Sequence, residues 1–269
     1  MKRVQLFEFE DQSWFPDFFR SSLTRLLSFL LRLMNLKKPV AELLKAKLKE
    51  IDTQHIVDLG SGAGGVMIDV FREIKQEDQF SEVTLTLTDL YPNTEAVHRI
   101  NNTKEAGLRY KEEPVDATRI SSAPEGLKTL VNSFHHLPKD KAAAVLKSCV
   151  ENKTPILIYE MAHNSLPTIL WWLLLPPSLI ILMVMALVMT PFVRPLSWKQ
   201  LFFTYVIPII PLTYAWDGQA SYARTYSFAD FKELLEGIDL SAYDFEIDFL
   251  KHVSEGKAPG YYVFGKPKK

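Results

Sequence analysis

The sequence has few of the features that mark several common protein classes. Its one cysteine, Cys149, excludes an intramolecular disulfide and fits a reducing compartment. The formal net charge is −1, so no overall positive field indicates nucleic acid as a partner. The first ten residues contain no continuous apolar run and do not look like a signal peptide. His135 and His136 are adjacent, without a cysteine or a spaced histidine beside them, so no metal site is indicated.

The stretch Ile56 to Gly65 (I-V-D-L-G-S-G-A-G-G) combines an apolar run, an acid and a cluster of glycines. The residues that follow, Val66 to Ile74, have helical spacing, so the segment predicts a buried strand, a tight turn and a helix. Glycines let the backbone approach a ligand closely, and a helix N-terminus presents free N–H groups to it. We therefore expect a nucleotide-type cofactor at this turn.

The glycine spacing fits two cofactor patterns. Gly60, Gly62 and Gly65 match the dinucleotide pattern G-x-G-x-x-G. Asp58 together with Gly60, Gly62 and Gly64 matches D-x-G-x-G-x-G, which resembles motif I of the class I S-adenosylmethionine (AdoMet) methyltransferases.

Two later segments extend the resemblance to that family. Val83 to Asp89 (V-T-L-T-L-T-D) is rich in strand formers and ends in an acid, where the family holds the ribose hydroxyls. Val115 to Ala117 (V-D-A) resembles the third motif, whose acid or neighbouring backbone meets the adenine. NAD enzymes also carry an acid after the second strand, so Asp58 and Asp116 are the residues that favour AdoMet.

The chain around these motifs alternates strands and helices, which is typical of a doubly wound sheet. Lys128 to Phe134 and Thr154 to Tyr159 predict the fourth and fifth strands, and Asp140 is expected to cap the helix between them. Tyr243 to Phe249 and Gly260 to Gly265 predict two late strands. They resemble the antiparallel ending of the methyltransferase sheet. The expected fold class is therefore α/β: a seven-stranded Rossmann-like methyltransferase sheet, order 3-2-1-4-5-7-6 with the last strand antiparallel, and helices on both faces.

Ligands of open α/β sheets bind beyond the carboxyl ends of the strands. By this rule and by the resemblance, ten residues are expected to bind the cofactor: Asp58, Gly60, Ser61, Gly62, Gly64, Asp89, Leu90, Asp116, Ala117 and Asn132. A hydroxyl acceptor would need a base, for which His135, His136 and Glu160 are candidates. For each of the three, the alternative is a residue that only shapes the cleft. Asn132 is followed by Ser133 and Phe134, which departs from the N/D-P-P-Y/F motif of amino-group methyltransferases.

An apolar insertion interrupts this pattern. No charged residue occurs between His163 and Arg194, a run long enough to span a bilayer core, and a second uncharged apolar run covers Leu201 to Trp216. The last strands must rejoin the same sheet, so a single crossing is excluded. A two-span hairpin would carry Arg194 and Lys199 to the far side, against the positive-inside tendency. Seven prolines are also expected to break long straight helices: Pro167, Pro176, Pro177, Pro191, Pro195, Pro208 and Pro211.

We therefore expect a re-entrant or interfacial helical cap on the cytoplasmic face of a membrane, peripheral or monotopic. The alternative is a folded apolar lid or a dimer interface in a cytoplasmic protein. Trp14 to Met34 predicts an N-terminal helix, either packed over the cofactor cleft or lying at a membrane interface through its aromatics and arginines. The expected divisions are an N-terminal helical extension (1–53), an AdoMet-binding core (54–162), the apolar insertion (163–216) and the C-terminal part of the core (217–269).

Asp217, Arg224 and Tyr226 form a polar group just after the insertion. One interpretation is an ion pair between Asp217 and Arg224 that fastens the cap. The other is a substrate site in which Arg224 binds a polar or anionic head group. The stretch Trp216 to Ser227 also resembles a bacterial subgroup of the family that has a similar apolar insertion before it.

The sequence thus predicts a membrane-associated AdoMet-dependent methyltransferase that acts on an apolar or amphipathic small molecule. One alternative is a methyltransferase with a soluble substrate, in which the insertion is only a lid or a dimer interface. Another is a membrane module that binds AdoMet without catalysis. An NAD-dependent enzyme is the last.

Overall fold

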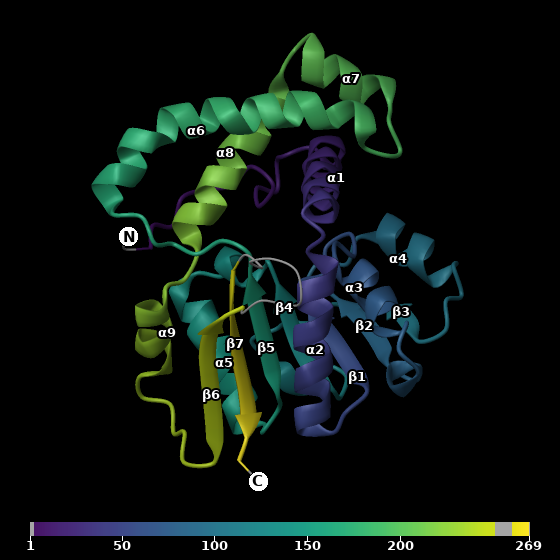
Figure 1. Cartoon of the computed structure of the whole chain (residues 1–269), viewed down its shortest axis with the longest axis vertical. Coiled ribbons are helices and arrows are strands. Elements are labelled where there is room, and N and C mark those ends of the chain that lie inside the picture. Colours follow the sequence, from purple (N-terminus) through teal and green to yellow (C-terminus); the bar gives the residue numbers. More distant parts are fainter. Residues whose placement is uncertain (1–2, 251–259, 269) are drawn as a thin grey trace. The chain divides into compact units, whose positions relative to one another are not determined.

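Seven strands form one sheet in the order β3-β2-β1-β4-β5-β7-β6 (Figure 1). In this computed structural model, which describes residues 3–250 and 260–268, β7 is antiparallel to β5 and to β6, and every other pair is parallel. The predicted strand order and the antiparallel last strand are confirmed. The strands are β1 His55–Leu59, β2 Thr84–Thr88, β3 Leu108–Tyr110, β4 Leu127–Val131, β5 Ile156–Glu160, β6 Tyr243–Phe249 and β7 Tyr261–Pro267.

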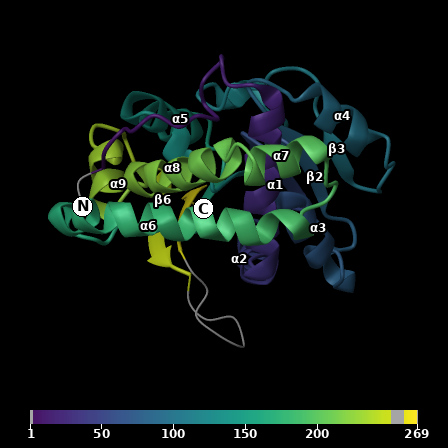
Figure 2. The ribbon, with the colours of Figure 1, turned by 90° about the horizontal axis from the view of Figure 1, so that it is seen from above.

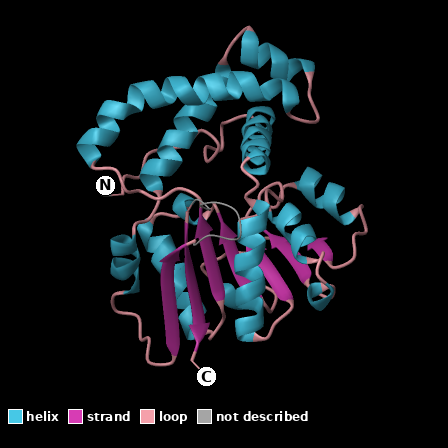
Figure 3. Cartoon of the chain, in the orientation of Figure 1, coloured by secondary structure: helices cyan, strands magenta, loops and turns pink. Residues whose placement is uncertain are grey.

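Helices cover both faces of this sheet (Figure 3), and α2 lies in front of it and α5 behind it in Figure 1. α2 packs on α3, and α5 packs on α9. β5 is buried over its whole length because helices cover both faces of the sheet. Strands covered in this way are mostly apolar in sequence. The helices of this part are α2 Lys37–Ile51, α3 Met67–Ile74, α4 Thr94–Asn101, α5 Lys139–Glu151 and α9 Phe228–Leu235, with short 3₁₀ turns η1 Asp78–Phe80, η2 Ile120–Ser122 and η3 Phe134–His136.

The expected cap of α5 is wrong. The helix begins at Lys139, with Pro138 at the N-cap position, and Asp140 lies inside the first turn. Pro138 has the extended backbone of an N-cap residue (φ −66°, ψ 160°), and its missing N–H is not needed by the helix. The negative charge of Asp140 in the first turn still interacts favourably with the positive end of the helix dipole.

A second group of helices gathers the N-terminus and the apolar insertion: α1 Asp17–Leu33, α6 Thr168–Met189, η4 Thr190–Phe192, α7 Trp198–Tyr205 and α8 Ile209–Arg224. α6 packs on α8, and both contact α1 (Figure 2). Their shared core joins Leu23 and Leu26 of α1, Ala186 and Met189 of α6, and Tyr214 of α8. The insertion and the N-terminal helix therefore have a common apolar core of their own.

The prolines do not break α6 as expected. The helix continues for 22 residues through Pro176 and Pro177. Proline removes one backbone hydrogen bond and clashes with the preceding turn, which can kink a helix without ending it. Within the described residues, Thr168–Phe192 is the one stretch long and apolar enough to cross a membrane. Its most apolar window has a mean hydropathy of 2.4, and 17% of that window is buried.

Contacts divide the chain into two compact units. One holds Met1–Met34 and His163–Ser227, and the other holds Asn35–Ala162 and Phe228–Lys269. The divisions expected at 53/54 and 216/217 differ from these limits. α2 packs on α3 and so joins the sheet unit, and residues 216 and 217 both lie inside the continuous helix α8.

Candidate functional site

The loop after β1 is held by Asp58, the last but one residue of that strand. Its Oδ2 accepts a hydrogen bond from Oγ of Ser61 at 2.6 Å, and its Oδ1 accepts one from Oγ1 of Thr129 in β4 at 2.7 Å. Burial raises the pKa of Asp58 to about 7, against the opposing effect of these two hydrogen bonds. Asp58 thus ties the glycine loop to the neighbouring strand.

Backbone conformation explains the glycines of this loop. Gly60, Gly62, Gly64 and Gly65 all have positive φ, a region that other residues seldom occupy. A Cβ atom at Gly62 would meet nothing within 4 Å, whereas one at Gly64 would lie 2.7 Å from Cδ1 of Ile68. A side chain at Gly64 would thus crowd the ends of two isoleucine side chains, whereas Gly62 leaves open space on the loop.

Asp89 follows β2 directly and joins the loops after the first three strands. Its Oδ2 accepts a hydrogen bond from the main-chain N–H of Gly62 at 2.8 Å, and its Oδ1 accepts one from the N–H of Tyr91. Its carbonyl accepts the N–H of Val115, the first residue of V-D-A. Each carboxylate oxygen can accept a second hydrogen bond. The carboxylate can therefore still receive donors such as ribose hydroxyls.

Of the expected adenine residues, Asp116 is fixed locally. Its Oδ1 accepts hydrogen bonds from the N–H and the hydroxyl of Thr118, and the latter bond is the main cause that lowers the pKa of Asp116. Ala117 is half-buried and Leu90 is exposed beside Asp89. Asp116 is thus ionised at neutral pH and adjoins the segment that bonds to Asp89.

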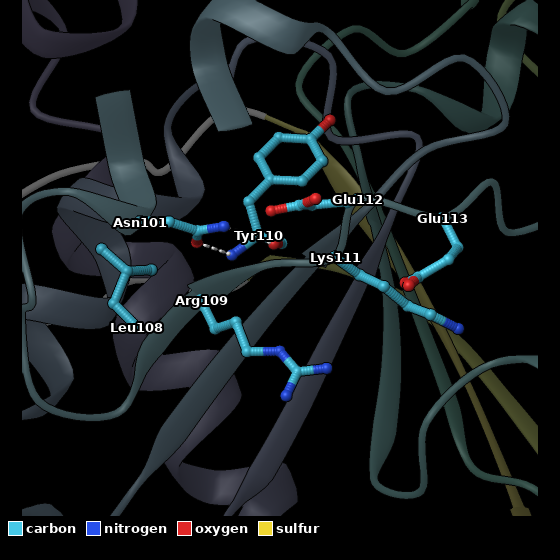
Figure 4. Close-up of a pocket in the computed structure, with 7 residues that line it drawn as sticks. All are labelled: Asn101, Leu108, Arg109, Tyr110, Lys111, Glu112 and Glu113. Atoms are coloured by element: carbon cyan, nitrogen blue, oxygen red, sulfur yellow. Dashed lines mark hydrogen bonds between the residues drawn. The ribbon is translucent and has the colours of Figure 1, made fainter. Parts of the chain in front are cut away.

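Tyr110 is a further residue of this region that the sequence did not single out. It ends β3, and its hydroxyl donates to the carbonyl of Gly62 at 2.8 Å. Its N–H donates to Oδ1 of Asn101 (Figure 4), and Arg109 points to the opposite side of the strand. These residues line a surface hollow of about 450 Å³ at the edge of the sheet. Tyr110 therefore braces the glycine loop from the β3 side.

A second set of polar atoms lies where β4 ends. Asn132 has a positive φ, and its Oδ1 accepts the N–H of Met161 at 2.7 Å, which ties the end of β4 to the end of β5. Its Nδ2 is buried without a hydrogen-bond partner among the described residues, and so is Oγ of Ser133. A Cβ atom at Gly60 would lie 3.8 Å from that hydroxyl. Because buried polar groups are nearly always hydrogen-bonded, two orphan donors beside the glycine loop fit a site that binds a polar ligand.

The candidate bases lie together on the same edge of the sheet. Nδ1 of His135 is 2.8 Å from Oε2 of Glu160, and Oε1 of Glu160 accepts the main-chain N–H of His135 at 3.0 Å. The ring of His136 lies 4.4 Å, between centroids, from that of His135. Glu160 is acceptor-only when ionised, so it holds the proton of His135 on Nδ1. The pair therefore has the arrangement of a base and the group that orients it.

The polar group after the insertion belongs to the other unit, and the expected ion pair between Asp217 and Arg224 is wrong. Asp217 accepts the main-chain N–H groups of Phe9 at 2.8 Å and Glu10 at 3.2 Å, and burial raises its pKa to about 7. Arg224 lies two turns further along the same side of α8 and binds the N-terminal segment through the carboxylates of Glu8 and Asp11. Both residues thus fasten the same segment, but not to each other.

The partners of Arg224 are two acids of that N-terminal segment. Its guanidinium lies 3.1 Å from Oε1 of Glu8 and 2.6 Å from Oδ2 of Asp11. The ring of Tyr226 is buried, with the guanidinium of Arg3 4.2 Å from its centroid. Arg224 and Tyr226 therefore have structural partners within their own unit.

Three supporting residues of the site were missed from the sequence: Tyr110, Thr129 and Ser133. Thr129 lies beside Asp58 in the register of β1 and β4, so only the pairing of the strands identifies it. Tyr110 ends a short strand that carries no motif. Ser133 was considered only for its departure from an amino-group motif, although its position after β4 signals the ligand edge of the sheet.

Comparisons with known proteins find similar solved structures but no similar sequence family. No protein-family model matches the sequence, and no curated protein matches it. The chain is similar to the solved structure of the plantazolicin methyltransferase BpumL in complex with SAH, at 14% identity and a TM-score of 0.58, with 97% of this chain and 94% of that chain covered. It is also similar to BamL in complex with a triazolic desmethylPZN analog and SAH, at 11% identity and a TM-score of 0.51, with 94% and 98% covered. With its sheet order, this chain therefore has the Rossmann-like fold of the class I methyltransferases.

Proposed function

We propose that this protein is an AdoMet-dependent methyltransferase. The observation that carries the proposal is a set of hydrogen bonds around the glycine loop, which connects the ends of three strands that carry acids. These bonds join Asp58 to Ser61, Asp89 to Gly62, and Asp89 to Val115, the neighbour of Asp116. The antiparallel β7 distinguishes this sheet from the parallel ending of a dehydrogenase.

The residues present fit the cofactor. Gly62 leaves open space, Asp89 can accept the ribose hydroxyls, and the orphan donors of Asn132 and Ser133 suit the carboxylate of the amino-acid end. Asp116 or its backbone would meet the adenine. When bound, AdoMet supplies an activated methyl group whose transfer is an in-line displacement, so alignment and exclusion of water can provide most of the acceleration.

For a hydroxyl acceptor, His135 would take the proton at Nε2. The carboxylate of Glu160 orients the ring through Nδ1 and stabilises the imidazolium that forms. His136 packs beside this ring, with 4.4 Å between the ring centroids. We therefore assign the base to His135, with Glu160 as its positioning residue.

We further propose that the acceptor is an apolar or amphipathic small molecule and that the protein is membrane-associated. The support is the apolar insertion, in which large apolar side chains are exposed to an extent that is unusual for a soluble protein. Ile169 and Leu173 of α6 are 78% and 70% exposed, and Trp198 of α7 is 71% exposed. A cytoplasmic membrane face would cover these side chains and supply such an acceptor.

The experiment for the cofactor is calorimetric titration of the full chain with S-adenosylhomocysteine (SAH), with NADH in a parallel titration. We expect micromolar binding of SAH and no heat with NADH. The reverse result would overturn the assignment of the cofactor, and silence with both would leave the fold as a scaffold without this activity.

The experiment for the membrane uses the exposed face of α6. Ile181 and Val184 are 59% and 51% exposed, whereas Leu182 packs against the core formed with α1 and α8. The double variant Ile181→Asp, Val184→Asp should lose its partition onto liposomes and keep its thermal stability and SAH affinity. A matched control, Phe249→Asp, adds charge at an exposed apolar residue of β6. Equal partition of wild type and the double variant would contradict membrane contact through α6.

A further inference from the structure

The two long sides of α6 differ in their surroundings although both are apolar. Ile169, Leu173, Ile180, Val184 and Val188 are exposed and recur at helical spacing along one side of the helix. The opposite side carries Trp171, Ala186 and Met189, which are buried, and Leu182, which packs on the core shared with α1 and α8. The exposed side therefore extends over the whole helix as one continuous apolar face.

The packing partners of α6 carry charges that do not belong in a bilayer core. α8 packs along α6 and contains Asp217 and Arg224, which bind the N-terminal segment. α8 has 16 residues and so spans ~24 Å, less than the ~30 Å of a hydrocarbon core. A crossing by α6 would need a returning span, and α8 is both too short and too polar to be one.

The charges of the insertion have one sign. Between residues 163 and 216 the chain has no aspartate or glutamate, and its two cations are both exposed: Arg194 in the link after η4 and Lys199 in the first turn of α7. Trp198 lies between them in sequence and is among the most exposed aromatic residues of the described chain. Exposed cations beside exposed aromatic and aliphatic side chains match the head-group region of an anionic bilayer.

We infer that α6 lies in the plane of an anionic membrane as a monotopic element. Its exposed face enters the acyl boundary along its full length, and Arg194 and Lys199 contact lipid phosphates at its C-terminal end. The inference rests on the membrane association proposed above and deepens it by assigning the orientation of the helix and the charge of the lipid. Such helices bury their apolar face only ~5–10 Å below the head groups.

The depth of α6 can be measured by site-directed spin labelling, because Cys149 is the one cysteine and is buried. Five single-cysteine proteins in a Cys149→Ala background carry the label at Ile169, Leu173, Ile180, Val184 or Val188, and Gln79→Cys serves as the water-exposed control. Accessibility to oxygen and to a nickel chelate gives each depth on vesicles of phosphatidylcholine and phosphatidylglycerol in equal parts. We expect the same shallow depth at all five positions.

A spanning helix gives a different profile. The labels at Ile169 and Val188 would then lie ~28 Å apart along the bilayer normal, with Ile180 deepest. That gradient would overturn the in-plane orientation and leave membrane association intact. Absence of any binding to these vesicles, with self-association seen by size-exclusion chromatography, would overturn both.

The lipid charge is tested separately with Lys199→Gln and Arg194→Gln. Each should weaken partition onto the phosphatidylglycerol vesicles about fivefold and leave partition onto pure phosphatidylcholine vesicles unchanged. Lys232→Gln, an exposed lysine of α9, is the matched control and should change neither. Equal loss on both vesicles, or no loss on either, would overturn the contact with anionic lipid.

Discussion

The carboxylate of Glu160 holds His135 at two points, through Nδ1 of the ring at 2.8 Å and through the main-chain N–H at 3.0 Å. Glu160 ends β5, and His135 lies in the turn after β4, so the pairing of two adjacent parallel strands brings them together. Because both oxygens are used, the contact fixes the position of the backbone as well as the orientation of the ring. The proton of the neutral ring is thereby assigned to Nδ1.

The first prediction concerns this tautomer. Glu160→Ala should shift the neutral ring of His135 from the Nδ1–H form towards the Nε2–H form, because the acceptor for Nδ1–H is lost. Glu160→Gln has one acceptor oxygen for the two N–H groups that Glu160 binds; with that oxygen on the main-chain N–H of His135, its NH₂ group faces Nδ1 and should also favour the Nε2–H form. Nitrogen chemical shifts of a ¹⁵N-histidine sample, assigned with His135→Gln, measure both. An Nε2–H ring in the wild type would contradict the role given to Glu160.

The second prediction concerns the open space at Gly62. Gly62→Val should reduce SAH binding by at least a hundredfold, because the side chain would occupy the ligand's approach to the loop. The positive φ adds backbone strain of ~1–2 kcal/mol to the folded protein. Gly237→Val is a matched control, since Gly237 also has a positive φ and open space but follows α9. Titration calorimetry and thermal unfolding of both variants separate strain from blocked binding, and retained SAH binding in Gly62→Val would show that the loop is misassigned.

The third prediction is a pH dependence at Asp58. Its pKa is about 7 in the folded protein and near 3.8 when unfolded, so the folded state binds the proton more tightly. The free energy of unfolding should therefore fall as the pH rises from about 4 to about 7, by ~4 kcal/mol at most, and be constant outside this window. Asp58→Asn mimics the protonated acid and should remove this part of the slope. Urea unfolding across the window measures it, with Asp78→Asn as an exposed control; equal slopes in wild type and Asp58→Asn would refute it.

The fourth prediction separates the two interpretations of Arg224. Removing one partner of a buried ion pair costs ~3–5 kcal/mol, so Arg224→Gln should lower thermal stability and speed proteolysis of the segment around Glu8 and Asp11. Arg119→Gln, an exposed arginine, should change neither. A stable Arg224→Gln protein with an intact N-terminal segment would instead favour the binding of a substrate head group by Arg224.

Much of the site could be predicted because its motifs are local. The sequence from Ile56 to Gly65 carries its own strand, acid and glycines, and Asp89 and Asp116 follow strand segments that can be recognised separately. The antiparallel ending was predicted from the resemblance of the two late strands to the end of the methyltransferase sheet, and the first of these strands can itself be recognised locally. Tyr243 to Phe249 alternates apolar and acidic residues, which is typical of a half-exposed strand, and it was found with those bounds.

The predictions that failed concerned residues whose partners lie far away in the sequence. Asp217 and Arg224 are seven residues apart on one helix, so an ion pair between them was plausible. The structure instead pairs both with residues 8 to 11, more than 200 residues earlier. Likewise, helical spacing could not show that Leu182 faces a core while Val184 is exposed, because every side of α6 is apolar.

The sequence by itself thus determined the strand segments, the position of the glycine loop and the acids around it, because strand periodicity and turn chemistry act over short stretches of chain. The order of the strands was predicted from the resemblance to the methyltransferase family. Only the tertiary structure decided which polar groups meet: Thr129 with Asp58, Tyr110 with Gly62, Glu160 with His135. The physical reason is that these contacts depend on strand register and packing, which bring together residues that no local pattern relates.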